Sequence, residues 1–441
     1  MDNPTNFVNF FPTKRLLVEI ITRDINIHDS ILDLVDNSVD SYVRHKIKSQ
    51  RKISIDISNK TFTIEDNCGG IDRNTLLNHV FRSGELPPHS AQTIGYYGIG
   101  LKRALFKLAE EFEFETYDGK DYSKIKMNVK DWLDKGDKDW NLELNLKDKS
   151  KVQYKKPFTK IFISKYKKEV PKILSSIFIN DLKKDLSIYY TRIIDSSIRI
   201  DFNKEELKPF DLAITHSKEI KPLVVLGEHD KVNYKILCWI EPKKKYRDPR
   251  ERGKIGWNIF MNDRLILVDD ISSITGWSGE RSEIPKYHQL YYQFRGIVMI
   301  ESKDPQLLPI NTTKNNFNIE HPIYHHIRQK MIETARPIIA YLRLKYKAEE
   351  VEDLEDEVEN KVEHDGNNQN NPERKSIDKL KPNLKFSAPR LKKRKDTTRI
   401  SFEKPKKDVD KIKRLYKLKS NPEVGEHTFN YFWSSEGLGD E

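Results

Sequence analysis

The first residues that could do chemistry are an acid and an amide four positions apart, Asp33 and Asn37. They lie in a stretch whose apolar residues recur at helical spacing, and residues four apart share one face of a helix. A carboxylate and a carboxamide on one face suit a base that polarises water beside a Mg²⁺ ligand. An amphipathic helix with one polar side gives the same pattern, so this stretch alone leaves both interpretations open.

A second candidate is Asp66, which ends a strand-like segment and is followed by Asn67, Cys68, Gly69 and Gly70. Such an aspartate can direct its carboxylate to the edge of a flat ligand, because glycine lets a ring approach the backbone closely. An ordinary turn closed by the aspartate side chain has the same composition. This cluster is therefore also ambiguous when it is taken alone.

A third candidate is the glycine-rich segment Gly95-Tyr96-Tyr97-Gly98-Ile99-Gly100-Leu101-Lys102, which opens a helical pattern. Backbone amides freed by glycine, a helix N-terminus and a lysine together can form a phosphate cradle. The segment is not a Walker loop, because leucine follows Gly100 where that loop has lysine and then serine or threonine. It is not a dinucleotide fingerprint either, since no acidic ribose clamp follows a βαβ unit.

The elements that position these residues are predicted from apolar periodicity. Residues 14–24 and 28–46 have helical spacing, whereas residues 52–58 and 61–66 alternate with period two around Asn59-Lys60, which predicts a hairpin. The polar, proline-containing residues 83–93 predict a mobile loop before the glycine-rich segment. Further strands are predicted at residues 112–118, 123–129, 142–146 and 159–164, and then at 197–202, 235–241, 257–262 and 296–302, followed by a helix from His321 to about Ala348.

In their order and spacing, the three clusters resemble the N, G1 and G2 boxes of the GHKL superfamily. This superfamily contains MutL, gyrase B subunits, heat-shock-90 chaperones, histidine kinases and MORC proteins. Phe158-Thr159-Lys160-Ile161 is similar to the later threonine-bearing box, so the resemblance covers about residues 14–165. It implies an α+β fold that begins with a Bergerat-type α/β sandwich, in which ATP lies between helices and a mixed sheet.

The resemblance also implies a role for each matching residue. Asn37 would hold Mg²⁺, and Asp66 would bind the adenine amino group. Gly98 and Gly100 would approach the phosphates, which Lys102 would contact. The other ATP-binding residues that it implies are Gly70, Ile71, Gly95, Ile99, Leu101 and Thr159.

Two residues depart from the pattern of the superfamily. Asp33 stands where hydrolytic members carry glutamate, so the catalytic base that it would provide is one methylene shorter. This difference predicts slow hydrolysis. Cys68 replaces the first glycine of the usual Asp-x-Gly-x-Gly, at a position that tolerates a small side chain.

Residues 308–314 follow a predicted strand and precede a predicted helix. They are similar to the loop of MutL, gyrase B and MORC transducer domains whose lysine reaches the γ-phosphate, which makes Lys314 a second catalytic candidate. A surface turn with a solvated lysine is the alternative. Residues 256–267 and 287–302 resemble bacterial MORC-like ATPases, although no zinc-binding CW module is present. The resemblance implies a transducer-like α/β domain of the ribosomal S5 type.

Composition limits the class of protein further. No apolar run approaches the ~20 residues that span a bilayer, so we expect a soluble, cytoplasmic protein with no membrane partner. The only cysteines, Cys68 and Cys238, cannot build a four-cysteine zinc site or a disulfide framework. The predicted organisation is an ATP-binding domain at residues 1–190, a transducer-like domain at 191–348, an acidic amphipathic helix at 349–364, a flexible linker at 365–400 and a basic helical C-terminal segment at 401–441.

These observations lead to the hypothesis of a slow ATPase that acts as an ATP-gated clamp or conformational switch. ATP and Mg²⁺ would be its ligands, and ATP would induce a homodimer. The net charge is +11, and residues 390–419 hold fourteen Lys and Arg against four acids. Together with the basic stretch 243–254, they predict a nucleic-acid partner, and family analogy suggests DNA maintenance or anti-phage defence.

Two other functions were weighed against the clamp. A slow or non-hydrolysing chaperone or scaffold that recruits protein partners is the main alternative, because Asp33 is a short base. A histidine kinase is disfavoured. It needs a phosphorylatable histidine on a dimerising helix upstream, whereas only residues 4–13 precede the first predicted helix.

Overall fold

The computed structural model describes most of the chain, and its residues form two compact units. One unit contains residues 1–339 and 370–387, and the other contains residues 340–369 and 388–441. The described residues are 12–82, 84, 92–95, 98–146, 156–217, 219–241, 255–281, 283–356, 373–389 and 400–436. Most of the predicted loop at 83–93, residues 390–399 of the predicted basic segment and the whole basic stretch 243–254 lie outside them.

The first sheet of the larger unit is mixed. Among the described residues it has eight strands in the order β5-β4-β3-β6-β2-β1-β7-β8. Neighbouring strands are antiparallel except for β1 and β7, which are parallel. The strands are β1 Arg51–Ile57, β2 Phe62–Asp66, β3 Ala109–Tyr117, β4 Tyr122–Asn128, β5 Leu144–Leu146, β6 Phe158–Tyr166, β7 Ile198–Phe202 and β8 Glu205–Glu206.

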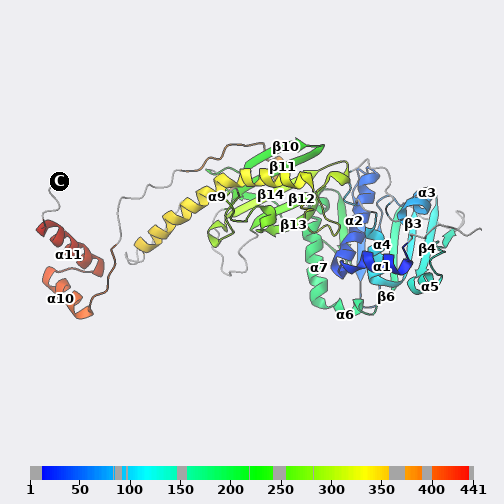
Figure 1. Cartoon of the computed structure of the whole chain (residues 1–441), viewed down its shortest axis with the longest axis horizontal. Coiled ribbons are helices and arrows are strands. Elements are labelled where there is room, and N and C mark those ends of the chain that lie inside the picture. Colours follow the sequence, from blue (N-terminus) through cyan, green and yellow to red (C-terminus); the bar gives the residue numbers. More distant parts are fainter. Residues whose placement is uncertain are drawn as a thin grey trace, which may run out of the picture. The chain divides into compact units, whose positions relative to one another are not determined.

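Helices α1, α2 and α4 pack together against this sheet (Figure 1). Their apolar side chains join those of the sheet in one core that includes Ile31, Ile53 and Phe112, each at most 1% exposed. The helices in this region are α1 Lys14–Arg23, α2 Ile27–Arg44, α3 Arg73–Thr75 with the π-helical turn η1 Leu76–Val80, α4 Gly100–Leu108, α5 Val129–Asp134, α6 Val170–Ile173, α7 Ser176–Tyr189 and α8 Thr191–Ser196.

The local signals in the sequence explain where the first elements begin. Asn26 precedes α2, and its side-chain oxygen accepts a hydrogen bond from the Asp29 amide at 2.7 Å, which satisfies one of the free amides of the first turn. The predicted hairpin is confirmed, because Ile57 of β1 pairs with Phe62 of β2. The helix predicted at the glycine-rich segment begins at Gly100.

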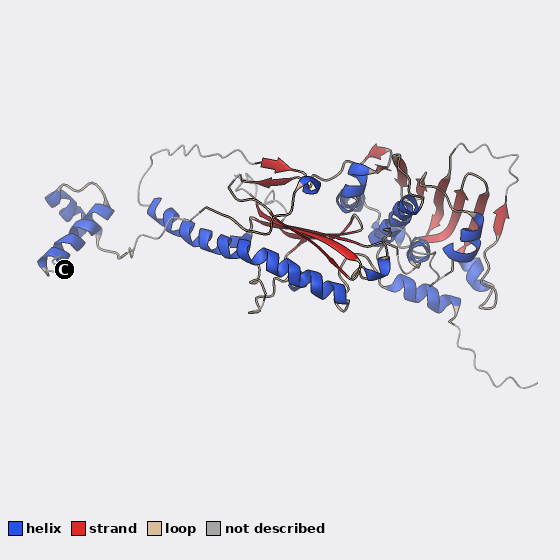
Figure 2. Ribbon diagram, turned by 90° about the horizontal axis from the view of Figure 1, so that it is seen from above, coloured by secondary structure: helices blue, strands red, loops and turns tan. Residues whose placement is uncertain are grey.

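A second sheet lies in the same unit, with the strand order β10-β11-β14-β12-β13 in the described chain. Helix α9 runs along one face, and the small β9–β15 pair lies on the other (Figure 2). The elements are β9 Ile214–His216, β10 Leu223–His229, β11 Val232–Ile240, β12 Gly256–Met261, β13 Arg264–Asp270, η4 Ser273–Thr275, η5 Gln289–Tyr291, β14 Phe294–Glu301, η6 Pro305–Leu307, α9 Pro322–Asp356, β15 Glu373–Lys375 and η7 Ile377–Lys379. The α+β class predicted from the sequence is confirmed.

Three predicted boundaries need correction. Strands β7 and β8 belong to the first sheet, so that sheet extends beyond the predicted boundary at residue 190. The predicted linker at 365–400 contains β15, which pairs with β9, and Ile377, which is 3% exposed against the second sheet. Residues 349–356 continue α9 and do not start a separate helix.

The described C-terminal segment of the smaller unit contains helices α10 Lys406–Tyr416 and α11 Asn421–Ser435. Val424 is the one apolar side chain of the two helices that is buried, at 7% exposure. Large apolar side chains are exposed on both helices, namely Leu415, Tyr416, Phe429, Tyr431, Phe432 and Trp433. None of the described helices is long and apolar enough to cross a membrane.

Candidate functional site

A cavity of about 320 Å³ lies between α2, the first sheet, the glycine-rich segment and a loop at residues 310–314. Its volume falls at the lower end of the roughly 300–1,000 Å³ typical of small-molecule sites. Of the predicted site residues, those that line it are Asn37, Asp66, Gly70, Ile71, Gly95, Gly98, Ile99, Gly100, Leu101, Thr159 and Lys314. The two predicted residues that do not line it are Asp33 and Lys102.

One end of the cavity combines a carboxylate with apolar walls. Asp66 is 5% exposed and accepts hydrogen bonds from the Ser38 hydroxyl at 2.7 Å and the Cys68 amide at 2.8 Å. Burial raises its pKa to about 6, although both hydrogen bonds favour the charged form. Leu34 and Ile161 line the walls beside it. A flat apolar ring with an N–H at its edge matches this arrangement, and we call it the base end.

Gly70 shows why glycine is required beside Asp66. Its φ is +69°, and a β-carbon there would lie 2.0 Å from the carbonyl oxygen of Tyr117. The next amide, of Ile71, donates to the Thr116 hydroxyl at 2.8 Å, and that hydroxyl lies 3.4 Å from the hydroxyl of Thr159. The turn after Asp66 is thus connected to Thr159, the threonine predicted to bind ATP, through the side chain of Thr116.

Asn37 faces the cavity from the middle of α2. Within the described structure its side-chain nitrogen is buried and has no hydrogen-bond partner. Buried amide groups are normally satisfied, so an unsatisfied one at a cavity wall marks a place for a ligand. The carboxamide also carries the oxygen donor that Mg²⁺ prefers, and the residue therefore fits the predicted metal position.

The glycine-rich segment is fastened to α2 before it enters α4. Both carboxylate oxygens of Asp40 accept backbone amides, one from Ile94 and one from Gly95, each at 2.8 Å. A β-carbon at Gly95 would lie 2.7 Å from that carboxylate, and Gly98 has a φ of +61°. The segment thus approaches α2 more closely than a side chain would permit. Tyr96 and Tyr97 lie outside the described residues.

The cation that lines the cavity here is Arg103, directly after the glycine-rich segment, and not Lys102. The Lys102 ammonium donates to the carbonyl oxygens of Val80 and Arg82, each at 3.0 Å, and burial lowers its pKa to about 8. Arg103 lines the cavity and pairs through its Nε with Asp33. The phosphate contact predicted for Lys102 is therefore not available in this arrangement.

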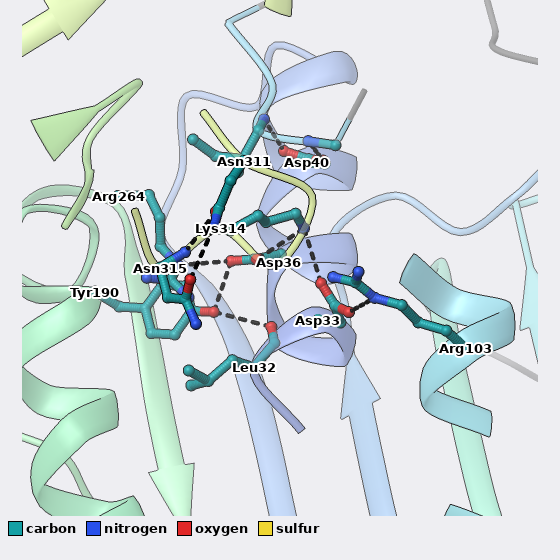
Figure 3. A network of polar contacts seen from close by, with 12 residues as sticks. Leu32, Asp33, Asp36, Asp40, Arg103, Tyr190, Arg264, Asn311, Lys314 and Asn315 are labelled. Carbon is teal, nitrogen blue, oxygen red and sulfur yellow. Dashed lines mark hydrogen bonds and ion pairs between the residues drawn. The ribbon is translucent and has the colours of Figure 1, made fainter. Parts of the chain in front are cut away.

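Beside the cavity, where Lys314 lines it, two carboxylates of α2 share this one lysine (Figure 3). Lys314 Nζ lies 3.1 Å from Asp33 Oδ1 and 2.8 Å from Asp36 Oδ2. Asp36 also accepts the Nε of Arg264 at 3.0 Å and the hydroxyl of Tyr190 at 2.6 Å. We call this part of the site the phosphate end. It consists of the ion-pair network around Lys314 and the adjoining glycine-rich segment up to Gly100.

The charges at the phosphate end compensate one another. Burial alone would raise the pKa of Asp36, but Lys314 and Arg264 lower it to about 2. Burial likewise opposes the charge of Lys314, yet the nearby carboxylates of Asp36 and Asp33 raise its pKa. Both groups are therefore charged near neutral pH, and each depends on the other for that charge.

Sequence reasoning missed several residues of this network. Asp36 lies three positions after Asp33, a spacing that also places two residues on one face of a helix, but only Asp33 and Asn37 were singled out from that stretch. Arg103 was overlooked because Lys102, directly before it, matched the phosphate-binding lysine that the resemblance implies. Arg264 and Tyr190 carried no local signal, because their partner Asp36 is 228 and 154 positions away along the chain.

Comparison with known families agrees with the geometry. Residues 25–158, which contain α2, the Asp66 turn and the glycine-rich segment, match the family described as histidine kinase-, DNA gyrase B-, and HSP90-like ATPases. They form a GHKL-type ATPase domain. The match includes Asn37, Asp66 and Gly100, but it ends before the second sheet and Lys314. No curated protein is similar enough to the chain to count as a match.

Proposed function

We propose that the chain binds Mg-ATP in this cavity and hydrolyses it slowly. Nucleotide binding would change how its two sheets are arranged and would induce a dimer with a second copy of the chain. The observation that carries the proposal is the position of Lys314. Its ammonium reaches the GHKL cavity from a loop after the second sheet and there neutralises Asp33 and Asp36 of α2. A γ-phosphate is a stronger, multiply charged partner for the same lysine.

The cavity offers a complementary partner for each part of the nucleotide. Asp66 accepts the adenine amino group at the base end, and the Asn37 carboxamide would hold Mg²⁺. The amides of Gly98 and Gly100, at the start of α4, supply donors and a positive helix terminus for the phosphates. Magnesium would neutralise phosphate charge and bridge the nucleotide to α2.

Slow hydrolysis follows from the surroundings of Asp33. The carboxylate is 2% exposed and is paired with both Arg103 and Lys314, so both cations occupy its oxygens and keep a water molecule from them. When Lys314 turns to a γ-phosphate, Asp33 loses one of its two ion pairs, and the oxygen released in this way is open to accept a proton from water. Nucleotide binding and activation of the base are thereby linked through one side chain.

A nucleic-acid partner is proposed for the C-terminal segment. Helix α10 carries five lysines or arginines among its eleven residues and lies beside exposed aromatic side chains of α11, Phe429 and Trp433 among them. Lysines attract phosphates, and exposed aromatic rings offer stacking surfaces for unpaired bases. The basic stretch 243–254 lies outside the described residues. A DNA-maintenance or defence role rests on family analogy.

The experiment that tests this proposal measures ATP hydrolysis with and without DNA, alongside molar mass by light scattering with a non-hydrolysable ATP analogue. We expect slow turnover, a dimer with the analogue and DNA affinity that falls by about 0.9 log units per neutralised phosphate for each log unit of salt. A truncation after Ser387 keeps β15 with its sheet and removes the basic segment, so it should lose that DNA affinity.

The chaperone or scaffold alternative is favoured by one observation, the doubly paired state of Asp33. It predicts nucleotide binding with no turnover and no response to DNA in the same assay. Absence of nucleotide binding would contradict both functions.

A further inference from the structure

The turn between β12 and β13 lies where the second sheet meets the GHKL cavity. Its two residues, Asn262 and Asp263, have positive φ values of 44° and 65°, which is the geometry of a tight two-residue hairpin. Asn262 is 6% exposed and Arg264, the first residue of β13, is 3% exposed. Both are polar, and both direct their side chains to residues of the ATPase domain.

Asn262 holds the entrance to the glycine-rich segment. Its side-chain nitrogen donates to the carbonyl oxygen of Thr93 at 2.8 Å and to that of Ser302 at 3.0 Å, while its side-chain oxygen accepts the Ser302 amide at 3.0 Å. Thr93 directly precedes the two amides that Asp40 accepts. The segment is thus held from α2 on one side and from the second sheet on the other.

Arg264 makes the parallel contact to α2. Its Nε donates to Asp36 at 3.0 Å, and its guanidinium lies 4.9 Å and 5.1 Å from the ring centres of Tyr189 and Tyr190. Asp36 is the neighbour of Asn37 in the helix. One short turn therefore touches the backbone that leads to the phosphate cradle and the helix that carries the predicted Mg²⁺ ligand.

A second turn with the same backbone geometry shows what an asparagine does at this position in an ordinary hairpin. Asn203 and Lys204, between β7 and β8, have φ values of 48° and 69°. The Asn203 side chain accepts the Ile57 amide at 2.8 Å and so stabilises its own sheet. The two asparagines share one backbone geometry but differ in burial and partners: Asn203 is exposed and bonds within its own sheet, whereas Asn262 is buried and also holds Thr93, two residues before the glycine-rich segment.

We propose that the β12–β13 turn is a second coupling point, distinct from Lys314, with Asn262 as its positioning residue. This inference rests on the proposed nucleotide binding. Phosphates in the cradle rearrange the glycine-rich segment, which changes the position of the Thr93 carbonyl, and Asn262 passes that change to β12, β13 and β14. Because coupling between sites is reciprocal, the same bond lets the second sheet influence nucleotide affinity.

The experiment compares hydrogen exchange of the full-length wild-type chain, Asn262→Gly and Asn203→Gly, each with and without Mg-ADP. ADP lacks the γ-phosphate, so the contact proposed for Lys314 cannot form. Glycine tolerates the positive φ of both turns, and the pair is therefore matched in backbone strain. We expect Mg-ADP to slow exchange in β12–β14 of the wild type and of Asn203→Gly, and to leave those strands unchanged in Asn262→Gly.

Nucleotide affinity is measured on the same samples. We expect Asn262→Gly to weaken Mg-ADP by about fivefold, the size of one ordinary hydrogen bond, and Asn203→Gly to leave it unchanged. Asn262→Asp keeps the acceptor for the Ser302 amide but removes the donors to the carbonyl oxygens of Thr93 and Ser302. It should behave like Asn262→Gly and covers the case in which the glycine variant does not fold.

The outcomes separate the two proposals. A wild type that binds no nucleotide contradicts the proposed function, and this inference falls with it. A wild type that binds Mg-ADP but shows no protection in the second sheet contradicts the inference alone. Equal protection in the wild type and in both Asn262 variants also overturns it and reduces the turn to a structural contact.

Discussion

The two ends of the cavity differ in how the charge of a buried aspartate is compensated. At the base end, Asp66 is buried with two hydrogen-bond donors, and burial outweighs them and raises its pKa to about 6. At the phosphate end, Asp36 is just as buried, yet Lys314 and Arg264 bring its pKa to about 2. Within the described parts of the chain, Asp66 has no ion-pair partner, whereas Asp36 is paired with both Arg264 and Lys314.

The difference has a consequence for binding. Under the proposed function the base end would accept a ligand with little rearrangement, because Asp66 already lines the cavity and its two bonds, from Ser38 and Cys68, need not break. The phosphate end must exchange partners, since Lys314 has to leave Asp33 and Asp36 before it can contact a phosphate. If the chain binds ATP as proposed, the base end would determine which nucleotide enters, and the phosphate end would determine how the chain responds.

The largest effect is expected at the boundary between the two ends. Asn37→Ala removes the carboxamide that would hold Mg²⁺, and its buried nitrogen has no partner to lose within the described residues. We expect Mg-ATP affinity to fall by more than about 100-fold with no loss of thermal stability, because charge-assisted and metal contacts are the strong ones. Titration calorimetry with Mg-ATP checks this, and wild-type affinity would remove Asn37 from the site.

The next effect isolates the exchange at the phosphate end. Lys314→Ala removes the cation that Asp33 and Asp36 share, so we expect ADP affinity to persist while the preference for ATP falls by about 10- to 100-fold. ATP-induced dimerisation should be lost as well. ADP and ATP affinities are measured beside molar mass by light scattering.

Lys314→Arg keeps the charge and is the control for the loss of the ion pairs. If Lys314→Ala retains both the ATP preference and dimerisation, the second sheet is unrelated to nucleotide sensing. The match to GHKL-type ATPases would stand in either case, since it ends at residue 158.

How much of each end could be predicted from the sequence follows from the range of its contacts. Asp66, Gly70 and Asn37 lie within one helix and one hairpin, where periodicity and glycine placement report directly on geometry. Lys314 was found only through resemblance to a family loop. Arg264 could not be found, because no local pattern signals a partner 228 residues away.

The misplaced boundaries have the same cause. Strand β7 pairs in parallel with β1, so Ile198 lies beside Arg51 although the sequence between them contains most of the domain. The polar composition around residue 377 predicted a linker, whereas one buried side chain, Ile377, and the pairing of β15 with β9 attach it to the second sheet. Composition does not report such single contacts.

A test confined to the base end is the effect of pH on ATP affinity. The acceptor of the adenine amino group must be ionised, and Asp66 in the free protein has a pKa of about 6. Protonation below that value replaces an acceptor with a hydroxyl donor, so affinity should fall by about tenfold between pH 7 and pH 5, as expected for one linked proton. Asp66→Asn should bind weakly and show no such pH dependence.

The same substitution separates binding from folding. The pKa of Asp66 in the folded chain lies above the usual value of about 3.9, so ionising it costs folding free energy as pH rises from 4 to 6. Asparagine carries no charge to desolvate and can still accept one of the two hydrogen bonds. Asp66→Asn should therefore leave the free energy of unfolding near pH 7 almost unchanged, and equal losses of stability and affinity would indicate a structural turn.

The smallest effect is expected for Lys102, and it tests whether the phosphate end has been assigned to the correct cation. The Lys102 ammonium donates to the carbonyl oxygens of Val80 and Arg82, whereas Arg103 lines the cavity. Lys102→Met leaves two carbonyls without their donor, so its cost should appear as lower stability, by about 1–3 kcal/mol. Its ATP and ADP affinities should stay within about twofold of the wild type, which is less than one hydrogen bond contributes.

Arg103→Met is the matched variant, because it removes a neighbouring cation of the same helix and should weaken both nucleotides more than Lys102→Met does. The two affinities are compared at a temperature where both variants are folded. If Lys102→Met weakens ATP by tenfold or more and Arg103→Met does not, the lysine turns into the cavity when nucleotide binds, and the phosphate contact first expected from the glycine-rich segment is correct after all.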